Sequence, residues 1–296
     1  MANWGDLLEV PIRLEHLDVG YGEGPHGVVH KKTVPFGIIA QAVEGTYIVH
    51  TPVGTQTASD GHVFITPPNM PLEITHLARE GDKTMRIRFV HFRFTFMGTI
   101  DLFDLYDLPS TTDLETSILY GELIQQLVDI KTRENGLSFT YWAKKNELAY
   151  RLLDVLLRTS VQKETYESRI AVLQELQPLL LFIRDHLHEP LDIDKLLRVF
   201  PFSRSSMFTL FREQFGQTPM EYVKTVRLNE ALRQICSTSL NIAEIADRTG
   251  FANSFHFSRE FKARFGMPPT VARKEHLIWE KWSTLGGKNS APTNLS

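Results

Sequence analysis

The chain has 296 residues, of which 42% are hydrophobic and 23% are charged, and its formal net charge is −3. This length predicts about two domains, and the apolar fraction excludes a fully disordered chain. A single cysteine excludes an intramolecular disulfide framework and a thiolate metal cluster. No apolar run approaches the roughly 18 residues of a membrane span, and the first residues lack a secretory signal, so we expect a cytoplasmic protein that does not enter the membrane.

Charge is distributed unevenly along the chain. Residues 171–276 contain 14 basic and 12 acidic side chains, whereas the remaining residues contain 18 basic and 23 acidic ones. A mildly basic C-terminal module beside an acidic partner domain is the direction expected if the C-terminal part binds phosphate.

Residues up to about 101 have the pattern of a β domain. Short runs rich in Val, Ile, Phe and Tyr are separated by turn residues, and we interpret the glycine-rich segment 20–27 as a flexible loop or arm. Many short strands at this spacing are typical of a small barrel or sandwich. The predicted strands are Val34–Val43, Thr46–Thr51, His62–Thr66, Leu72–His76 and Met85–Phe96.

After Pro109 the hydrophobic period changes from that of a strand to that of a helix. Apolar residues within 114–130 fall on one helical stripe, and those within 148–156 fall on another. These two helices are expected to pack on the β domain, on each other or on a second subunit. The polar stretch 159–168 has no apolar period and is the predicted linker to a region that is helical throughout.

An internal repeat is the strongest signal in the sequence. Phe211–Pro219 recurs fifty residues later as Phe261–Pro269, and each copy predicts a short helix, a turn and a capped second helix. Ser203 and Asn253 stand at the N-cap of the second helices, where a side-chain oxygen accepts a free backbone N–H of the first turn. Gly250 suits a turn that needs a positive φ.

This arrangement is a helix-turn-helix unit that occurs twice. The connector 220–235 is long enough to be a rigid helix, which would let the two second helices, about one DNA turn (roughly 34 Å) apart, read successive major grooves. The face opposite each apolar stripe mixes cations for phosphate with short polar and aromatic side chains for base edges. These predicted DNA-contacting residues are Arg204, Ser205, Phe208, Thr209 and Arg212 in the first unit and Ser254, Phe255, Ser258, Arg259 and Lys262 in the second.

The second unit resembles the signature of the AraC family of bacterial transcription regulators. The matching stretch, Ile242–Pro269, follows the family's second helix-turn-helix nearly position by position. The first unit matches less closely, because Leu197 stands where a small residue is usual and Pro201 lies in the turn. The resemblance implies double-stranded DNA as a partner, with base contacts from Ser205, Phe208, Thr209, Ser254, Phe255 and Arg259.

Parts of the β region are similar to a cupin-like barrel that often precedes this domain in the family. The similar segments are Gly61–Ile74 and Arg88–Phe94, and the resemblance implies a barrel that binds a small effector, frequently a sugar, followed by dimerising helices. A metal-dependent cupin enzyme is disfavoured, because Leu72 occupies a position where many cupins carry a histidine and the His-x-His pair is missing. We therefore expect no metal, no cofactor and no enzymatic activity.

Three hypotheses remain open from the sequence. In the first, an effector in the barrel of a homodimeric regulator changes promoter occupancy or contact with RNA polymerase, and DNA changes effector affinity by the same factor. The second is a cupin enzyme with a DNA-binding appendage, and the third is a constitutive DNA-binding protein whose barrel only dimerises. For the first, strand alternation and aromatic stacking on a sugar face suggest the pocket residues. They are Phe36, Tyr47, His50, Phe64, Arg88 and Phe92.

The predicted fold class is α+β. A cupin-like β-barrel with two following helices precedes an all-α C-terminal domain of two helix-turn-helix units joined by a connector helix. The predicted bounds are 1–110 for the effector-binding barrel, 111–160 for the helical dimerisation segment, 161–172 for a linker, 173–275 for the DNA-binding domain and 276–296 for a tail.

Overall fold

The computed structural model describes residues 12–96, 100–133, 138–200 and 203–274. Apart from the chain ends, its contacts define two compact units: an N-terminal unit of His16–Arg93 and Asp107–Val161, and a C-terminal unit of Phe94–Tyr106 and Gln162–Glu275. The segment 94–106, which the sequence analysis placed in the barrel, therefore belongs with the C-terminal helices. The predicted tail lies outside the described residues.

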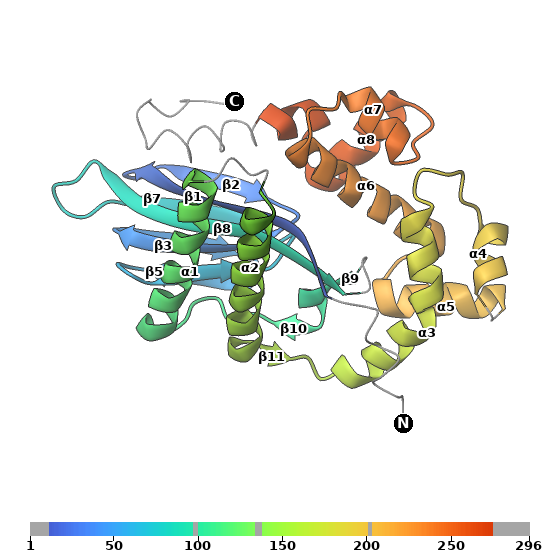
Figure 1. Cartoon of the computed structure of the whole chain (residues 1–296), viewed down its shortest axis with the longest axis horizontal. Helices are drawn as coiled ribbons and strands as arrows, with labels where there is room; N and C mark the ends of the chain where they lie inside the picture. The colour runs from blue at the N-terminus through green and yellow to red at the C-terminus, as the bar shows by residue number, and fades with distance from the viewer. Residues whose placement is uncertain (1–11, 97–99, 134–137, 201–202, 275–296) are drawn as a thin grey trace. The chain divides into compact units, whose positions relative to one another are not determined.

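The N-terminal unit is built on two sheets (Figure 1). One has the strand order β1-β8-β3-β6, and the other has the order β2-β7-β4-β5; the short strand β9 pairs with the end of β8 at Thr95 and Phe96, within the segment 94–106 of the C-terminal unit. Among the described strands the two sheets share no member and no ladder joins β5 to β6. The sheets therefore do not close into one barrel, and the prediction of a closed barrel was wrong. The strands are β1 (Arg13–Pro25), β2 (Val29–Thr33), β3 (Gly37–Glu44), β4 (Thr46–Thr51), β5 (Gly54–Ala58), β6 (Val63–Thr66), β7 (Pro71–Leu77), β8 (Thr84–Phe96) and β9 (Ile100–Asp101).

The glycine-rich segment interpreted from the sequence as a flexible loop lies largely within strand β1. Its glycines permit close packing: a Cβ on Gly24 would lie 2.3 Å from Cδ2 of His76, and one on Gly22 would lie 3.0 Å from Cδ1 of Ile87. Glycine inside a strand commonly marks such a close approach. The loop interpretation was wrong because the reason for these glycines lies in strands far away in the sequence.

The core of the N-terminal unit combines residues of both sheets. Ile38, Phe64 and Phe89 of the first sheet belong to the same buried cluster as Tyr47 and Leu72 of the second. Because one cluster takes side chains from both sheets, the sheets face each other with this core between them.

Two helices cover the other face of the first sheet (Figure 1). They are α1 (Leu114–Arg133) and α2 (Phe139–Thr159), which pack on each other and confirm the two predicted helices, although the first residues of the predicted stripe on α1 are exposed. Gln41 of β3 alternates with the core residues of its strand and points to α1, where its Nε2 donates to the Ser117 carbonyl at 3.0 Å.

The C-terminal unit is helical after its first short elements, as the sequence predicted. Its first long helix begins at Tyr166, so the segment 161–172 predicted as a linker contains strand β11 (Val161–Gln162) and the first turns of a helix. No described helix of the chain is long and apolar enough to cross a membrane. The remaining elements are the 3₁₀ turn Leu102–Asp104, β10 (Tyr106–Asp107), α3 (Tyr166–Asp185), α4 (Ile193–Val199), α5 (Arg204–Phe215), α6 (Pro219–Ser237), α7 (Ile242–Arg248) and α8 (Ser254–Phe265).

Candidate nucleic-acid interface and ligand pocket

The first helix-turn-helix unit consists of α4 and α5. The side chain of Ser203 accepts a hydrogen bond from the Ser206 N–H at 3.2 Å and so begins α5, as predicted. Met207 and Phe211 of α5 are fully buried in a cluster that also contains residues of α3 and α4. Pro201, which the sequence analysis placed in the turn, lies outside the described residues.

The second unit consists of α7 and α8, and a side chain caps the start of each helix. Asn241 and Glu244 form a capping box at the start of α7, and the Asn253 side chain accepts from the His256 N–H at 2.8 Å at the start of α8. Gly250 has the positive φ predicted for the turn, 77°. Phe257 is one of three phenylalanines on the inner face of α8, and all three are buried in a hydrophobic cluster separate from that of α5.

Helix α6 connects the two units. It begins with a capping box between Thr218 and Glu221 and extends beyond both ends of the predicted connector. Halfway along α6, Arg227 donates from Nε to the Leu187 carbonyl at 2.9 Å and from a terminal nitrogen to the Glu189 carbonyl at 2.6 Å. These bonds tie the connector to the segment that follows α3 and fix its position within the C-terminal unit.

The structure places nearly all of the predicted DNA-contacting residues on the solvent side of α5 and α8. Phe255 is 88% exposed, an unusual state for a phenylalanine in a well-packed domain. The side chain of Arg259 is 76% exposed. Phe208 differs, because it packs partly against the core cluster of the first unit with the Arg204 guanidinium carbon 5.9 Å from its ring centroid. Ser254 and Ser258 are half-buried, whereas the exposed members of the set are Arg204, Ser205, Thr209, Arg212, Phe255, Arg259 and Lys262.

One acidic residue on α8 is neutralised locally. Glu260 forms an ion pair with Lys224 of α6 at 2.7 Å, and this hydrogen bond holds the pKa of the Glu260 carboxyl below its usual value. Arg259 lies 3.8 Å from the same carboxylate. Because Glu260 remains charged but is paired with Lys224, the outward face of α8 keeps the positive character that phosphate binding needs.

The six residues predicted to line an effector pocket do not surround one cavity. Tyr47 and Phe64 lie inside the core between the sheets, with ring centroids 4.8 Å apart. Arg88 points to the opposite face of its sheet, where it hydrogen-bonds Gln41 and Gln125 of α1. Phe92 shares the face of Arg88 by strand alternation.

The other two predicted pocket residues differ in burial. Phe36 is half-buried, packs against the core cluster of Tyr47 and Phe64, and stacks on His91 with centroids 4.6 Å apart. His50 is exposed on β4 and shares a 2.7 Å hydrogen bond with the Thr55 hydroxyl. Among the described residues, no group of three or more His, Cys, Asp or Glu side chains is placed to hold a metal ion.

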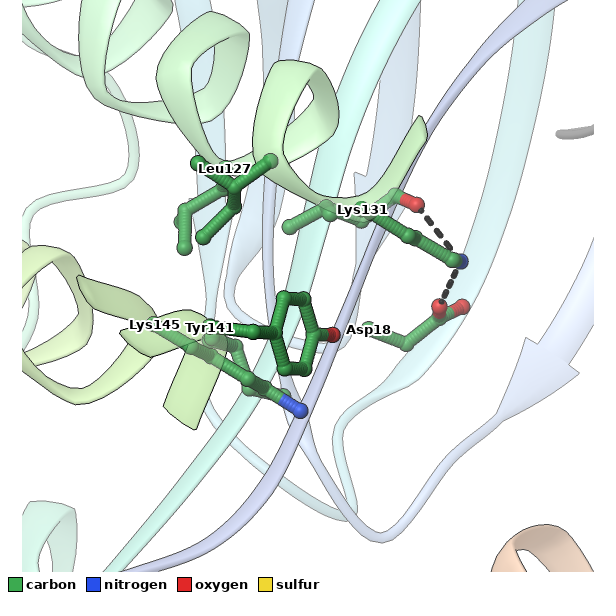
Figure 2. A pocket seen from close by; sticks show the side chains of 8 residues that line it. Asp18, Leu127, Lys131, Tyr141 and Lys145 are labelled. Atoms are coloured by element: carbon green, nitrogen blue, oxygen red, sulfur yellow. Dashed lines mark hydrogen bonds and ion pairs between the residues drawn. The ribbon is translucent and has the colours of Figure 1, made fainter. Parts of the chain in front are cut away.

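A pocket of about 190 Å³ lies elsewhere in the N-terminal unit, between β1, α1 and the start of α2 (Figure 2). Lys131 of α1 connects this helix to β1, because its Nζ donates to an Asp18 carboxylate oxygen at 2.8 Å and to the Val19 carbonyl at 3.0 Å. Sequence analysis missed this site, because its β1 residues and its helix residues are more than a hundred positions apart and β1 was not predicted. The lining residues are Leu17, Asp18, Val19, Leu127, Ile130, Lys131, Tyr141 and Lys145.

Comparisons with known proteins agree with the repeat geometry. A family profile described as a helix-turn-helix domain (HTH_18) matches residues 196–275. The HTH-type transcriptional activator RhaS of Escherichia coli is 27% identical over 166 residues, which is 56% of this chain and 58% of RhaS, so the match spans little more than half of that relative.

Two solved structures extend the comparison. ToxT from Vibrio cholerae, crystallised with an unsaturated fatty acid bound, is 12% identical and has a TM-score of 0.52 over 92% of this chain and 98% of its own, which shows a shared two-part fold. A transcriptional regulator with an AraC-type DNA-binding domain from Chromobacterium violaceum is 26% identical over 36% of this chain and 96% of its own, with a TM-score of 0.35.

Proposed function

We propose that the protein is an AraC-type transcription regulator that binds double-stranded DNA through α5 and α8, because a helix-turn-helix family profile matches residues 196–275. The observation that carries the proposal is the duplication: two capped helices with buried aromatic inner faces carry cations and small polar groups on their outer faces. Two such helices in one rigid unit match the reading of successive major grooves.

The outer residues divide by chemistry into two roles. Arg204, Arg212 and Lys262 are exposed cations that neutralise phosphates and set affinity. Arg259 has the length and donors to bind guanine bidentately, and the exposed ring of Phe255 suits a thymine methyl group. The remaining members contact bases or sugar from shorter side chains or, for Phe208, from a partly covered ring; they are Ser205, Phe208, Thr209, Ser254 and Ser258.

Replacement of Arg259 by alanine tests this assignment. We expect specific binding to weaken by about 1–3 kcal/mol and preference at one base pair to relax. The measurement is a fluorescence-anisotropy titration of full-length protein on a duplex selected from random DNA, repeated on every single-base variant of it. Arg158→Ala is the matched control, since that side chain on α2 is also 76% exposed and its removal changes net charge equally. Equal effects of both substitutions would overturn the role of Arg259.

The N-terminal unit is proposed to bind a small effector that controls DNA binding. The family resemblance favours a sugar, and the fatty acid in the ToxT structure makes a carboxylate the second candidate class. By linkage, an effector that changes DNA affinity must bind with an affinity that DNA changes by the same factor. A constitutive regulator, in which the N-terminal unit only dimerises and binds no effector, would bind its operator with an affinity that no small molecule changes.

The homodimer is proposed to form through α1 and α2. Both helices expose large apolar side chains, which is the composition of a surface that another chain covers. Sedimentation-equilibrium measurement of a monomer mass at all concentrations would overturn this assignment. The exposed apolar residues are Leu114, Ile118 and Leu119 on α1 and Phe139, Trp142 and Tyr150 on α2.

A further inference from the structure

The pocket between β1, α1 and α2 has a chemistry that DNA binding does not use. Leu17, Leu127 and Ile130 give it apolar contacts, but more of its lining is polar and includes two ammonium groups and one carboxylate. We propose that this pocket binds a small carboxylate through Lys145. This inference rests on the proposed function only in assigning the ligand the role of effector, because the binding site itself requires no DNA.

The ion pair at the pocket wall accounts for two of the three charges. Burial opposes ionisation of Asp18, but Lys131, His91 and His16 together outweigh burial and lower the pKa of this carboxyl, so Asp18 is charged at neutral pH. Lys131 in turn has two acceptors, the Asp18 carboxylate and the Val19 carbonyl. Figure 2 shows this pair on one side of the pocket and Lys145 on the other.

Lys145 carries the ammonium group of the pocket that is not part of the Asp18–Lys131 ion pair. Its Nζ lies 5.1 Å from the centroid of the Trp142 ring, and among the described residues no carboxylate or carbonyl accepts a hydrogen bond from it. Burial lowers the pKa of Lys145, while the nearby Asp18 carboxylate partly counters this effect and the Lys131 ammonium adds to it. A half-buried ammonium with three donors and no acceptor is costly, and an anion entering the pocket removes that cost.

The balance of charge and size narrows the ligand class. Two ammonium groups and one carboxylate leave a single positive charge, which a carboxylate matches and a phosphate, with a charge of about −1.5 to −2 at neutral pH, exceeds. The volume of about 190 Å³ is smaller than the roughly 300–1,000 Å³ of pockets for drug-sized ligands. Leu17, Leu127 and Ile130 offer apolar contacts to a short hydrocarbon or aromatic body, and the ammonium group of Lys145 offers donors to its carboxylate.

The experiment is a binding titration on full-length protein by isothermal calorimetry and thermal shift. The probes are benzoate and hexanoate, with benzamide, hexanamide and inorganic phosphate as comparisons of similar shape or charge. We expect a saturable rise in Tm with a carboxylate and none with its amide, because ligand bound only to the folded state adds stability. Failure of both carboxylates, or equal binding of an amide or of phosphate, would overturn the proposal.

Two lysine variants locate the site. Lys145→Met keeps the hydrophobic stem and removes the charge, and it is expected to weaken carboxylate binding by roughly 10- to 100-fold, the size of one charged hydrogen bond. Lys144→Met is the matched control, since Lys144 precedes it on α2 but pairs with Glu147 at 2.7 Å outside the pocket, and we expect unchanged binding. If Lys145→Met does not fold, Lys145→Gln retains a donor without the charge and carries the same expectation. Unchanged binding in the folded Lys145 variant would place the ligand elsewhere and overturn the proposal.

Failure of this inference and failure of the proposed function are distinguishable. DNA affinity of the same preparations is measured with and without the bound carboxylate. Intact operator binding without carboxylate binding removes the pocket assignment alone. Carboxylate binding that depends on Lys145 but leaves DNA affinity unchanged supports the site and removes its role as an effector site.

Discussion

Replacement of Phe261 by alanine is expected to lower the free energy of unfolding of the C-terminal unit by about 3–5 kcal/mol. Phe261 is completely buried in the core of the second helix-turn-helix, and its ring centroid lies 5.5 Å from that of Phe257 and 4.6 Å from that of Phe265. Alanine would leave a cavity in the middle of this row. Because native proteins are stable by only about 5–15 kcal/mol, such a loss removes much of the margin.

Phe255→Ala on the same helix is the matched comparison. Its ring is 88% exposed, so we expect the free energy of unfolding to change by no more than about 0.5 kcal/mol. Operator affinity is expected to fall in this variant, because its ring is proposed to contact a base. Urea unfolding followed by circular dichroism and titration with the selected duplex separate the two effects. A large loss of stability in Phe255→Ala would contradict the exposed position and with it the proposed contact.

Replacement of Gly250 by alanine is expected to destabilise the C-terminal unit by about 2–5 kcal/mol. At a φ of 77° an L-residue costs roughly 1–2 kcal/mol. In addition, the new Cβ would lie 2.2 Å from the Leu187 carbonyl oxygen and 2.8 Å from Cζ of Arg227. That carbonyl accepts a hydrogen bond from Arg227 of the connector, so neither group can move without loss. Overpacking of this kind adds about 1–3 kcal/mol.

Gly216→Ala isolates the contribution of the contact. Gly216 ends α5 with a φ of 66°, and nothing lies within 4 Å of a Cβ built there. The Gly216→Ala variant therefore has the conformational cost without the steric clash, and we expect its free energy of unfolding to fall by only about 1–2 kcal/mol. Urea unfolding of both variants at one pH gives the comparison. Equal losses would show that the turn relaxes freely and that the Leu187 contact does not constrain it.

The sequence by itself determined the helical half of the protein. Ser203 and Asn253 were predicted as N-caps, and both accept the expected backbone N–H. The buried stripe of α8 and the positive φ of Gly250 were predicted as well. These features are readable because a helix buries residues three and four positions apart and a cap acts over three residues, so the information is local.

The tertiary structure alone decided the arrangement of the N-terminal unit. The glycines of β1 resemble a loop locally, yet Gly24 is required by the ring of His76. Arg88 was grouped with Tyr47 in one pocket, whereas the pleat directs it to the helix-covered face. Strand composition does not state which sheet a strand joins or what covers each face, since ladder partners are set by residues distant in sequence.

The pocket illustrates the same limit at the level of function. Asp18 and Lys131 are separated by more than a hundred residues, and their pairing leaves Lys145 as the group available to an anion. No spacing rule relates these three positions, because their proximity follows from α1 and α2 packing on a sheet that begins with β1. Short-range periodicity thus determined the two helix-turn-helix units, and long-range packing determined where the N-terminal unit has a pocket.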